Sequence, residues 1–510
     1  MTLMSRFAAL FVFLVAPSTA AAQFTLEARF ASRLPPGPHA VGFRVVEQYD
    51  GTRLQVDATE YALHADRYVR GRPMQTLIWY PARPSGTAAP MRFREYAELF
   101  SADGSFPASG DGAVAGLLDY LHQRDSSASV VQRELGSPVR AFRNAAAAAG
   151  KFPVIVYAPG TNAPAFLNEQ LGEFLASHGY IFVASPSWGP LGETETVARD
   201  LEYLVAFART LPNAEPTRVA LMGHSLGGVA VVMVAARNPS ISVVVSLDGT
   251  MVYQHKYLRD VVSTHAMKEY AVPTLFLTQA PFDEDMRETF NADSTFVFFD
   301  TLRYADAWRV NFHRLRHRNF SSVTNRLLTS EDPLEFNPDP VVVSSDYDTM
   351  TRYTVNFLNA YLKGDSAGFA FLSRPPSTNG YAHDVVSEVH KRAWPNRFEL
   401  VRRLQSASAE DIAKERERIV ARVGQYSDLD AESLNDWAKV LVVRRPADAL
   451  AGARVMTTLY PTFARGFVTA GVAASAAAGD SAAARYFRRA FELDSSMVWL
   501  KGWISQHGQR

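Results

Sequence analysis

One short segment of the chain combines the residue types needed for nucleophilic chemistry, Gly223-His224-Ser225-Leu226-Gly227. It follows the apolar run Val219 to Met222, which has the character of a buried strand, and it opens an apolar helix-length segment. A serine between two glycines at a strand-to-helix turn is typical of a nucleophile elbow, in which the turn exposes the hydroxyl at the edge of a sheet. The spacing therefore predicts that Ser225 is a nucleophile.

A serine hydroxyl is a poor nucleophile at neutral pH, so it needs a base, and the base needs an acid that orients it. In sheets with such an elbow the chain order is serine, then aspartate or glutamate, then histidine. Asp248 ends the strand-like run 243–247, 23 residues after Ser225, and Asp283 lies in an acidic loop after the run 274–277. The pattern alone leaves both aspartates as candidates for the acid.

Of the twelve histidines, two follow both aspartates at a suitable place, His313 and His317. His224 is inside the elbow and is excluded by its position. His317 lies further beyond the strand-like run 308–312, in a loop that would hang over the edge of the sheet. We therefore predict that His317 is the base and that His313 has a role in the core or at a strand edge.

The segments around these residues predict the fold that must position them. From residue 153 to about 277, short apolar runs without polar alternation are separated by helix-length segments, as a parallel sheet buried on both faces requires. The fold class is therefore α/β, with a doubly wound, mostly parallel sheet. Strands are expected at 41–48, 75–80, 154–157, 180–184, 219–222, 243–247, 274–277 and 308–312.

Two regions depart from this alternation. Residues 84–150 form an insertion before the third core strand, and an insertion of this length is typical of a lid. After a linker at 376–396, residues 397–510 are rich in Ala, Arg, Glu and Leu, and residues 447–463 align with 481–497 at a shift of 34, which is the tetratricopeptide period. We expect an all-α, repeat-like domain there, with 23–375 as the catalytic domain.

Composition limits the classes of function. The 510 residues carry 52 Lys and Arg against 52 Asp and Glu, so no net charge favours nucleic acid or an anionic membrane, and the absence of cysteine excludes disulfides and thiolate chemistry. Residues 1–22 have one arginine, an apolar run and a small-residue end, which predict a signal peptide cleaved near Gln23. We expect an exported chain with no transmembrane segment in its mature form.

Three segments together resemble a known family: the elbow continued to Gly228, Leu247-Asp248-Gly249, and His317-Arg318-Asn319-Phe320-Ser321. They are similar to the platelet-activating-factor acetylhydrolase group of the α/β-hydrolases, close to dienelactone-hydrolase-like esterases, over roughly residues 37–365. The resemblance implies an α/β-hydrolase fold, Asp248 as the acid in preference to Asp283, and a serine hydrolase acting on a small or lipid-like carboxylic ester. No metal or organic cofactor is implied, since the chain has no zinc-binding or nucleotide-binding motif.

One loop departs from the pattern of that group, which has His-Gly where this chain has Pro159-Gly160-Thr161-Asn162. The loop would present a backbone N–H to the oxyanion, with the second donor at Leu226, and Thr161 and Asn162 both remain candidates. Trp188, after the run 180–184, is a candidate for the pocket wall or for packing beneath the lid. The alternative function is a tetratricopeptide-type scaffold that binds a protein partner and carries a hydrolase-fold domain of little activity.

Overall fold

A computed structural model describes most of the chain, namely residues 30, 32–53, 71–101, 106, 110–121, 128–188, 194–252, 267, 269–280, 296–327 and 340–507. The predicted signal peptide and Asp283 lie outside these ranges. Contacts divide the chain into two compact units. The first comprises Met1–Pro216 and Arg314–Val355, and the second comprises Thr217–His313 and Asn356–Arg510.

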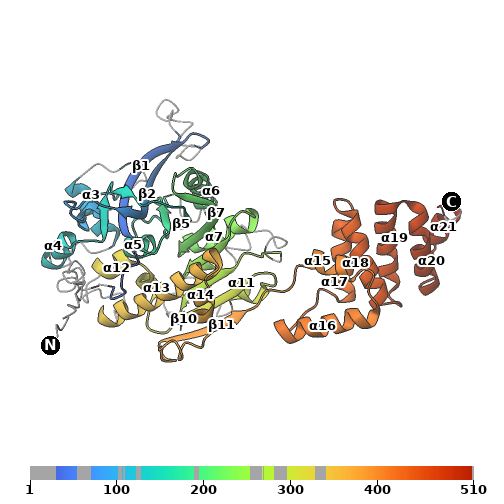
Figure 1. The fold of residues 1–510 in the computed structure, drawn as a ribbon. Helices are drawn as coiled ribbons and strands as arrows, with labels where there is room; N and C mark the ends of the chain where they lie inside the picture. The colour runs from blue at the N-terminus through green and yellow to red at the C-terminus, as the bar shows by residue number, and fades with distance from the viewer. Residues whose placement is uncertain are drawn as a thin grey trace, which may run out of the picture. The chain divides into compact units, whose positions relative to one another are not determined.

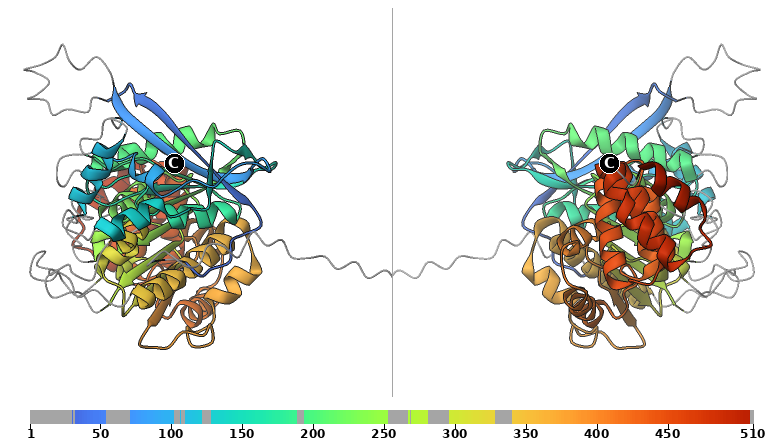
Figure 2. Two further views of the ribbon diagram at one scale, coloured as in Figure 1. Left: turned by 90° about the vertical axis from the view of Figure 1, so that its left-hand side faces the viewer. Right: turned by 90° about the vertical axis from the view of Figure 1, so that its right-hand side faces the viewer.

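The strands of the first unit follow the order β5-β6-β2-β1-β3, with β4 also paired to β2. β5 and β6 are parallel, whereas β2 runs antiparallel to both β6 and β1. β1 and β2 form a long two-stranded ribbon, visible in blue in Figure 2. The bounds are β1 Ala40–Asp50, β2 Arg72–Arg83, β3 Ala141–Arg143, β4 Ala146–Ala147, β5 Phe152–Ala158 and β6 Ile181–Ala184.

The helices of the first unit lie in the expected insertion, after β5 and β6, and near the candidate base. Every residue of β5 and β6 is buried, which explains their uninterrupted apolar sequences. The long helix α13 continues past Val355 into the second unit. The bounds are α2 Arg94–Ala97, α3 Asp111–Tyr120, α4 Ala128–Gly136, α5 Glu169–Ser177, α6 Thr194–Arg209, α12 Ser322–Leu327 and α13 Pro340–Lys363.

The second unit holds four parallel strands in the order β7-β8-β9-β10, followed by the antiparallel strand β11. β8 and β9 are buried along their whole length. All eight strands expected from the sequence are therefore present in the two units. The bounds are β7 Ala214–His224, β8 Val243–Leu247, β9 Thr274–Gln279, β10 Ala307–Phe312 and β11 Val386–Lys391, with helices α7 Leu226–Arg237 and α11 Val297–Thr301.

Strand β11 lies inside the segment expected to be a linker, 376–396. It pairs with β10 over six residues, from Ala307 opposite Lys391 to Phe312 opposite Val386. Its sequence, Val-Ser-Glu-Val-His-Lys, has one fully buried residue, because an edge strand is covered on one side only. The expected linker thus contains an edge strand of the sheet, and the chain between β11 and the helical tail is short.

The tail consists of helices that pack in sequence order, from α17 on α18 to α20 on α21 (Figure 1). α18 and α20 are each 14 residues long and begin 34 residues apart, at the spacing found in the sequence. The tetratricopeptide assignment stays a prediction. The bounds are α14 Ser366–Leu372, α15 Arg397–Leu404, α16 Ala409–Val423, α17 Ala431–Leu441, α18 Pro446–Leu459, α19 Ala464–Ala478, α20 Asp480–Leu493 and α21 Trp499–His507.

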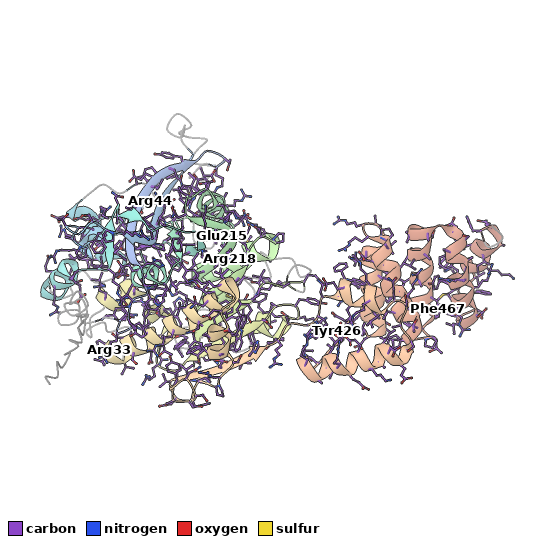
Figure 3. The ribbon with its side chains drawn as sticks, viewed as in Figure 1. Arg33, Arg44, Glu215, Arg218, Tyr426 and Phe467 are labelled. Atoms are coloured by element: carbon purple, nitrogen blue, oxygen red, sulfur yellow. The ribbon has the colours of Figure 1, made fainter. Side chains whose placement is uncertain are left out.

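The tail has its own apolar core, and a buried ionic cluster joins its start to the rest of the second unit. Tyr426, labelled in Figure 3, is buried in that core with its ring centroid 5.0 Å from that of Trp394. The fully buried carboxylate of Asp428 accepts hydrogen bonds from the Tyr304 hydroxyl and the Arg397 guanidinium. Tyr304 precedes β10, so this carboxylate links the first tail helix to the sheet. The predicted domain boundaries stay predictions.

Candidate active site

Ser225 occupies the turn between β7 and α7 with an unusual backbone conformation, φ 54° and ψ −123°. This region is sparsely populated by residues that carry a Cβ, and a residue held there costs of order 1–3 kcal/mol. The surrounding backbone fixes the conformation. The Ser225 N–H donates to the carbonyl of Leu247 (3.2 Å), and the Ser225 carbonyl accepts from the N–H groups of Gly228 (2.9 Å) and Thr250 (3.1 Å).

The glycines around the turn are required by close backbone approaches. A Cβ on Gly223 would lie 2.2 Å from the carbonyl oxygen of Gly227, which accounts for the first glycine of the motif. A Cβ on Gly228 would lie 2.6 Å from the Cα of Gly249, where α7 crosses the end of β8. Sequence reasoning assigned no role to this second contact, because the two glycines are 21 positions apart and the pattern does not indicate that they meet.

Asp248 lies at the end of the strand beside the nucleophile strand. β7 and β8 are parallel with His224 opposite Leu247, so Ser225 and Asp248 follow matching positions at the same edge. The Asp248 side chain is fully buried, and its Oδ1 accepts a hydrogen bond from the backbone N–H of Gln279 (3.0 Å). The Asp248 N–H donates to the carbonyl of Leu277 (2.7 Å). One bond from the carboxylate and one from the backbone therefore fix Asp248 against β9, whereas Asp283 lies outside the described residues.

His317 opens a 3₁₀ helix, η4 (His317–Phe320), in the first unit. Asn319 closes the turn with two hydrogen bonds to Arg316. The side-chain Oδ1 of Asn319 accepts from the backbone N–H of Arg316 (2.8 Å), and the backbone N–H of Asn319 donates to the Arg316 carbonyl (2.8 Å). Asn319 also exchanges hydrogen bonds with Asn325 of α12. The buried Asn and Phe of His317-Arg-Asn-Phe-Ser are thus structural, while His317 stays half-buried.

The loop after β5 holds both candidates for the first oxyanion donor. Asn162 has φ 48°, in the left-handed region that Asn tolerates better than most residues. Ser187 ties the loop down, since its N–H donates to the carbonyl of Ala163 (3.1 Å) and its hydroxyl donates to the carbonyl of Gly160. Thr161 and Asn162 are both half-buried. Leu226 is the first residue of α7, where backbone N–H groups have no acceptor within the helix.

The structure divides the candidate residues between its two units. Ser225, Leu226 and Asp248 belong to the second unit. The first unit contains His317, together with the loop that carries Thr161 and Asn162. Within the second unit the candidate nucleophile and the candidate acid share one sheet edge, and within the first unit the candidate base lies on a braced turn.

Known proteins are similar to this chain in sequence and in structure. Residues 155–375 match the model of the alpha/beta hydrolase family. The structure is similar to that of a ferulic acid esterase from Streptomyces cinnamoneus, with a TM-score of 0.50 over 70% of this chain and 98% of that one, at 18% identity. The fold is that of the α/β-hydrolases. The fold class expected from the sequence, with its helical C-terminal region, is confirmed.

Two curated relatives are also similar over a shorter stretch. The cutinases est1 and est2 of Thermobifida alba are each 26% identical over 132 residues, which is 25% of this chain. The match covers 41% and 40% of those proteins, so the chain spans less than half the length of the relatives it matches. The narrower resemblance to the acetylhydrolase group stays a prediction.

The side chain of Trp188 contacts the insertion at residues 84–150. Its indole lies edge-on to the ring of Phe100, with centroids 6.0 Å apart, and Phe100 precedes α3. The Trp188 carbonyl accepts from the guanidinium of Arg72 (2.6 Å), which also pairs with the buried carboxylate of Asp200 (2.7 Å). The ion pair holds Arg72, and the hydrogen bond from Arg72 fixes the Trp188 carbonyl. Both predicted roles of the Trp188 side chain stay predictions.

His313 lies at the end of β10, with its Nε2 3.1 Å from the hydroxyl of Ser387 on β11. Its backbone N–H donates to the carbonyl of Val385 (3.0 Å). This is the strand-edge setting that we expected for His313. Over the described ranges, no group of three or more His, Asp or Glu side chains could hold a metal ion.

Proposed function

We propose that this α/β-hydrolase is a serine carboxylic-ester hydrolase that acts through an acyl-enzyme on a small or lipid-like ester. The observation that carries the proposal is the backbone of Ser225, which is held at φ 54° and ψ −123° by three hydrogen bonds and close glycine contacts. A strained non-glycine residue persists only where its surroundings over-determine it, and such residues cluster at functional sites. The names of the relatives, two cutinases and a ferulic acid esterase, support an ester as substrate.

The proposed mechanism assigns each residue one role. His317 takes the proton of the Ser225 hydroxyl as its oxygen attacks the ester carbonyl carbon, and Asp248 orients and stabilises the imidazolium. The negative oxygen of the tetrahedral intermediate accepts hydrogen bonds from the N–H of Leu226 and from the loop that carries Thr161 and Asn162. Collapse expels the alcohol, which takes the proton from His317. Water then attacks the acyl-enzyme with His317 as base, releasing the acid and free Ser225.

The test is ester hydrolysis by the purified chain over a panel of p-nitrophenyl esters from acetate to palmitate, with a serine-directed phosphonate as inhibitor. Ser225→Ala and His317→Ala should each lower kcat by roughly 10⁴–10⁶-fold and abolish labelling by the phosphonate, because members of a triad act as a unit. Ser345→Ala, on the exposed side of α13, is the matched control and should keep full turnover. Turnover that survives in a folded Ser225→Ala protein would refute the proposal.

We also propose an interaction module in the tail and export of the chain. The equal lengths and 34-residue offset of α18 and α20 support tetratricopeptide-like units, which bind protein partners in a groove. None of the helices in the described residues is long and apolar enough to cross a membrane. Export is tested by N-terminal sequencing of the secreted chain, which should begin at Gln23.

A further inference from the structure

The side chain of Asn168 makes four hydrogen bonds inside the first unit. Its Nδ2 donates to the carbonyl of Phe320 (3.0 Å) and to the hydroxyl oxygen of Tyr157 (2.8 Å). Its Oδ1 accepts from the N–H of Ser322 (2.9 Å) and from the hydroxyl of Tyr347 (2.9 Å). Asn168 is 1% exposed, and it precedes α5 at the end of the loop that carries the candidate oxyanion donors. This amide therefore uses its whole hydrogen-bonding capacity.

The orientation of the amide is fixed by its two backbone partners. The Phe320 carbonyl can only accept and the Ser322 N–H can only donate, so a rotated amide would place oxygen against oxygen and N–H against N–H. Burial raises the pKa of the hydroxyls of Tyr157 and Tyr347, so both stay protonated. The amide of asparagine is the side chain that supplies donors on one side and an acceptor on the other at this length.

Two further bonds join the same two chain segments. The hydroxyl of Ser321 donates to the carbonyl of Leu167 (3.0 Å), and the N–H of Val323 donates to the same carbonyl (3.2 Å). Residues 167–168 thus bind four consecutive residues, 320–323, that are more than 150 positions away. Phe320 is the last residue of η4, and His317 is the first. The position of the base is therefore set from a segment outside its own turn.

We propose that Asn168 is a positioning residue for His317. The inference rests on the proposed function and deepens it. Asn168 holds both ends of the junction between η4 and α12, so it sets the height and tilt of the turn from which the imidazole projects. A displacement of about 1 Å at a reacting group costs on the order of 10² in rate. Asn168→Ala should accordingly lower kcat about 100-fold while KM stays unchanged.

The decisive variant is Asn168→Asp, which keeps the shape and replaces the donor by an ionisable oxygen. The ionised carboxylate would face the Phe320 carbonyl and repel it, whereas the protonated carboxyl would keep a donor there. Two ionisable side chains contact Asn168 directly, those of Tyr157 and Tyr347. The next residue along the chain, Glu169, is buried, and its Oε1 lies 3.3 Å from the Nε of Arg326. Burial should favour the protonated form of the introduced carboxyl.

The pH dependence of kcat separates positioning from mere stability. In the parent enzyme kcat should rise with pH to a plateau, because a general base acts only in its unprotonated form. In Asn168→Asp it should fall again as the introduced carboxyl ionises, giving a bell-shaped profile with KM unchanged, and phosphonate labelling should follow the same profile. Asn168→Ala should show no second ionisation. Far-UV circular dichroism at each pH verifies that the proteins remain folded.

Two milder variants keep the test decisive if the buried substitution unfolds the chain. Ser321→Ala removes the side-chain bond to Leu167 and the acceptor of the Thr324 N–H and hydroxyl, and it should lower kcat about tenfold at constant KM. Tyr347→Phe leaves both backbone bonds of Asn168 intact and should keep kcat within about fivefold. A parent-like kcat and pH profile in both Asn168→Asp and Ser321→Ala, with Ser225→Ala inactive, would overturn this inference alone. Full turnover of Ser225→Ala would instead overturn the proposed function.

Discussion

Replacing Ser225 by glycine should give a more stable protein than replacing it by alanine, the reverse of the ordinary order. The conformation at φ 54° and ψ −123° costs a residue with a Cβ of order 1–3 kcal/mol, and glycine avoids this cost. Glycine also has more conformational entropy than alanine in the unfolded chain, which offsets about 0.4–1 kcal/mol of the strain that glycine avoids. The free energy of unfolding of Ser225→Gly should therefore exceed that of Ser225→Ala by about 1 kcal/mol.

The assay is urea unfolding of both variants, monitored by far-UV circular dichroism. Ser345, exposed on α13, is the reference site, because glycine in a helix is less stable than alanine by about 1 kcal/mol. The difference between the two sites should approach about 2 kcal/mol, visible as opposite shifts of the urea midpoints. The reasoning is refuted if glycine at position 225 is destabilising relative to alanine by as much as it is at position 345.

Three other predictions address the acid, a buried carboxyl and the tail. Asp248→Asn should lower kcat about 10⁴-fold, while Asp283→Asn should stay within about tenfold; steady-state kinetics in which the two variants rank oppositely would make Asp283 the acid. Burial raises the pKa of Glu173 to about 7, so the folded state binds this proton more tightly and stability falls as pH rises from about 4.5 to 7. Between these pH values the free energy of unfolding should fall by at most about 3 kcal/mol through this group, and Glu173→Gln should reduce that fall. Urea unfolding of the parent and the variant at pH 5 and pH 8 measures the difference. A chain ending after Lys391, which keeps β11 beside β10, should retain kcat on a soluble ester, and an inactive but cooperatively melting product would contradict this.

The sequence is sufficient to predict the strands that are buried on both faces. Phe152–Ala158 is a continuous apolar run and Val243–Leu247 is apolar except for Ser246, and the structure buries every residue of both. β11 was not predicted, because it lies at the edge of the sheet and is only partly buried. Its sequence places Glu388 and His390 beside two valines, so it contains no apolar run. The pattern of hydrophobic residues reports burial, so it locates an edge strand poorly.

The candidate site was predictable to the extent that its geometry is local. The elbow at Ser225 follows from glycine spacing within one turn, and the close contact of Gly223 with Gly227 is a feature of that turn alone. The contact between Gly228 and Gly249 joins two turns, and sequence spacing does not report it. Choosing between Asp248 and Asp283 likewise depends on the position of an imidazole, which no local pattern determines.

Different interactions thus position the two parts of the proposed triad, Ser225 with Asp248 on one side and His317 on the other. Ser225 and Asp248 end neighbouring parallel strands, so the sheet register alone brings them to one edge. His317 begins a four-residue 3₁₀ turn, which has few backbone hydrogen bonds of its own and so depends on side-chain contacts and on neighbouring segments. Its position is set by buried polar contacts with residues 167–168, which are costly to leave half-satisfied. Substitutions at that contact should therefore affect the base while leaving the nucleophile turn intact.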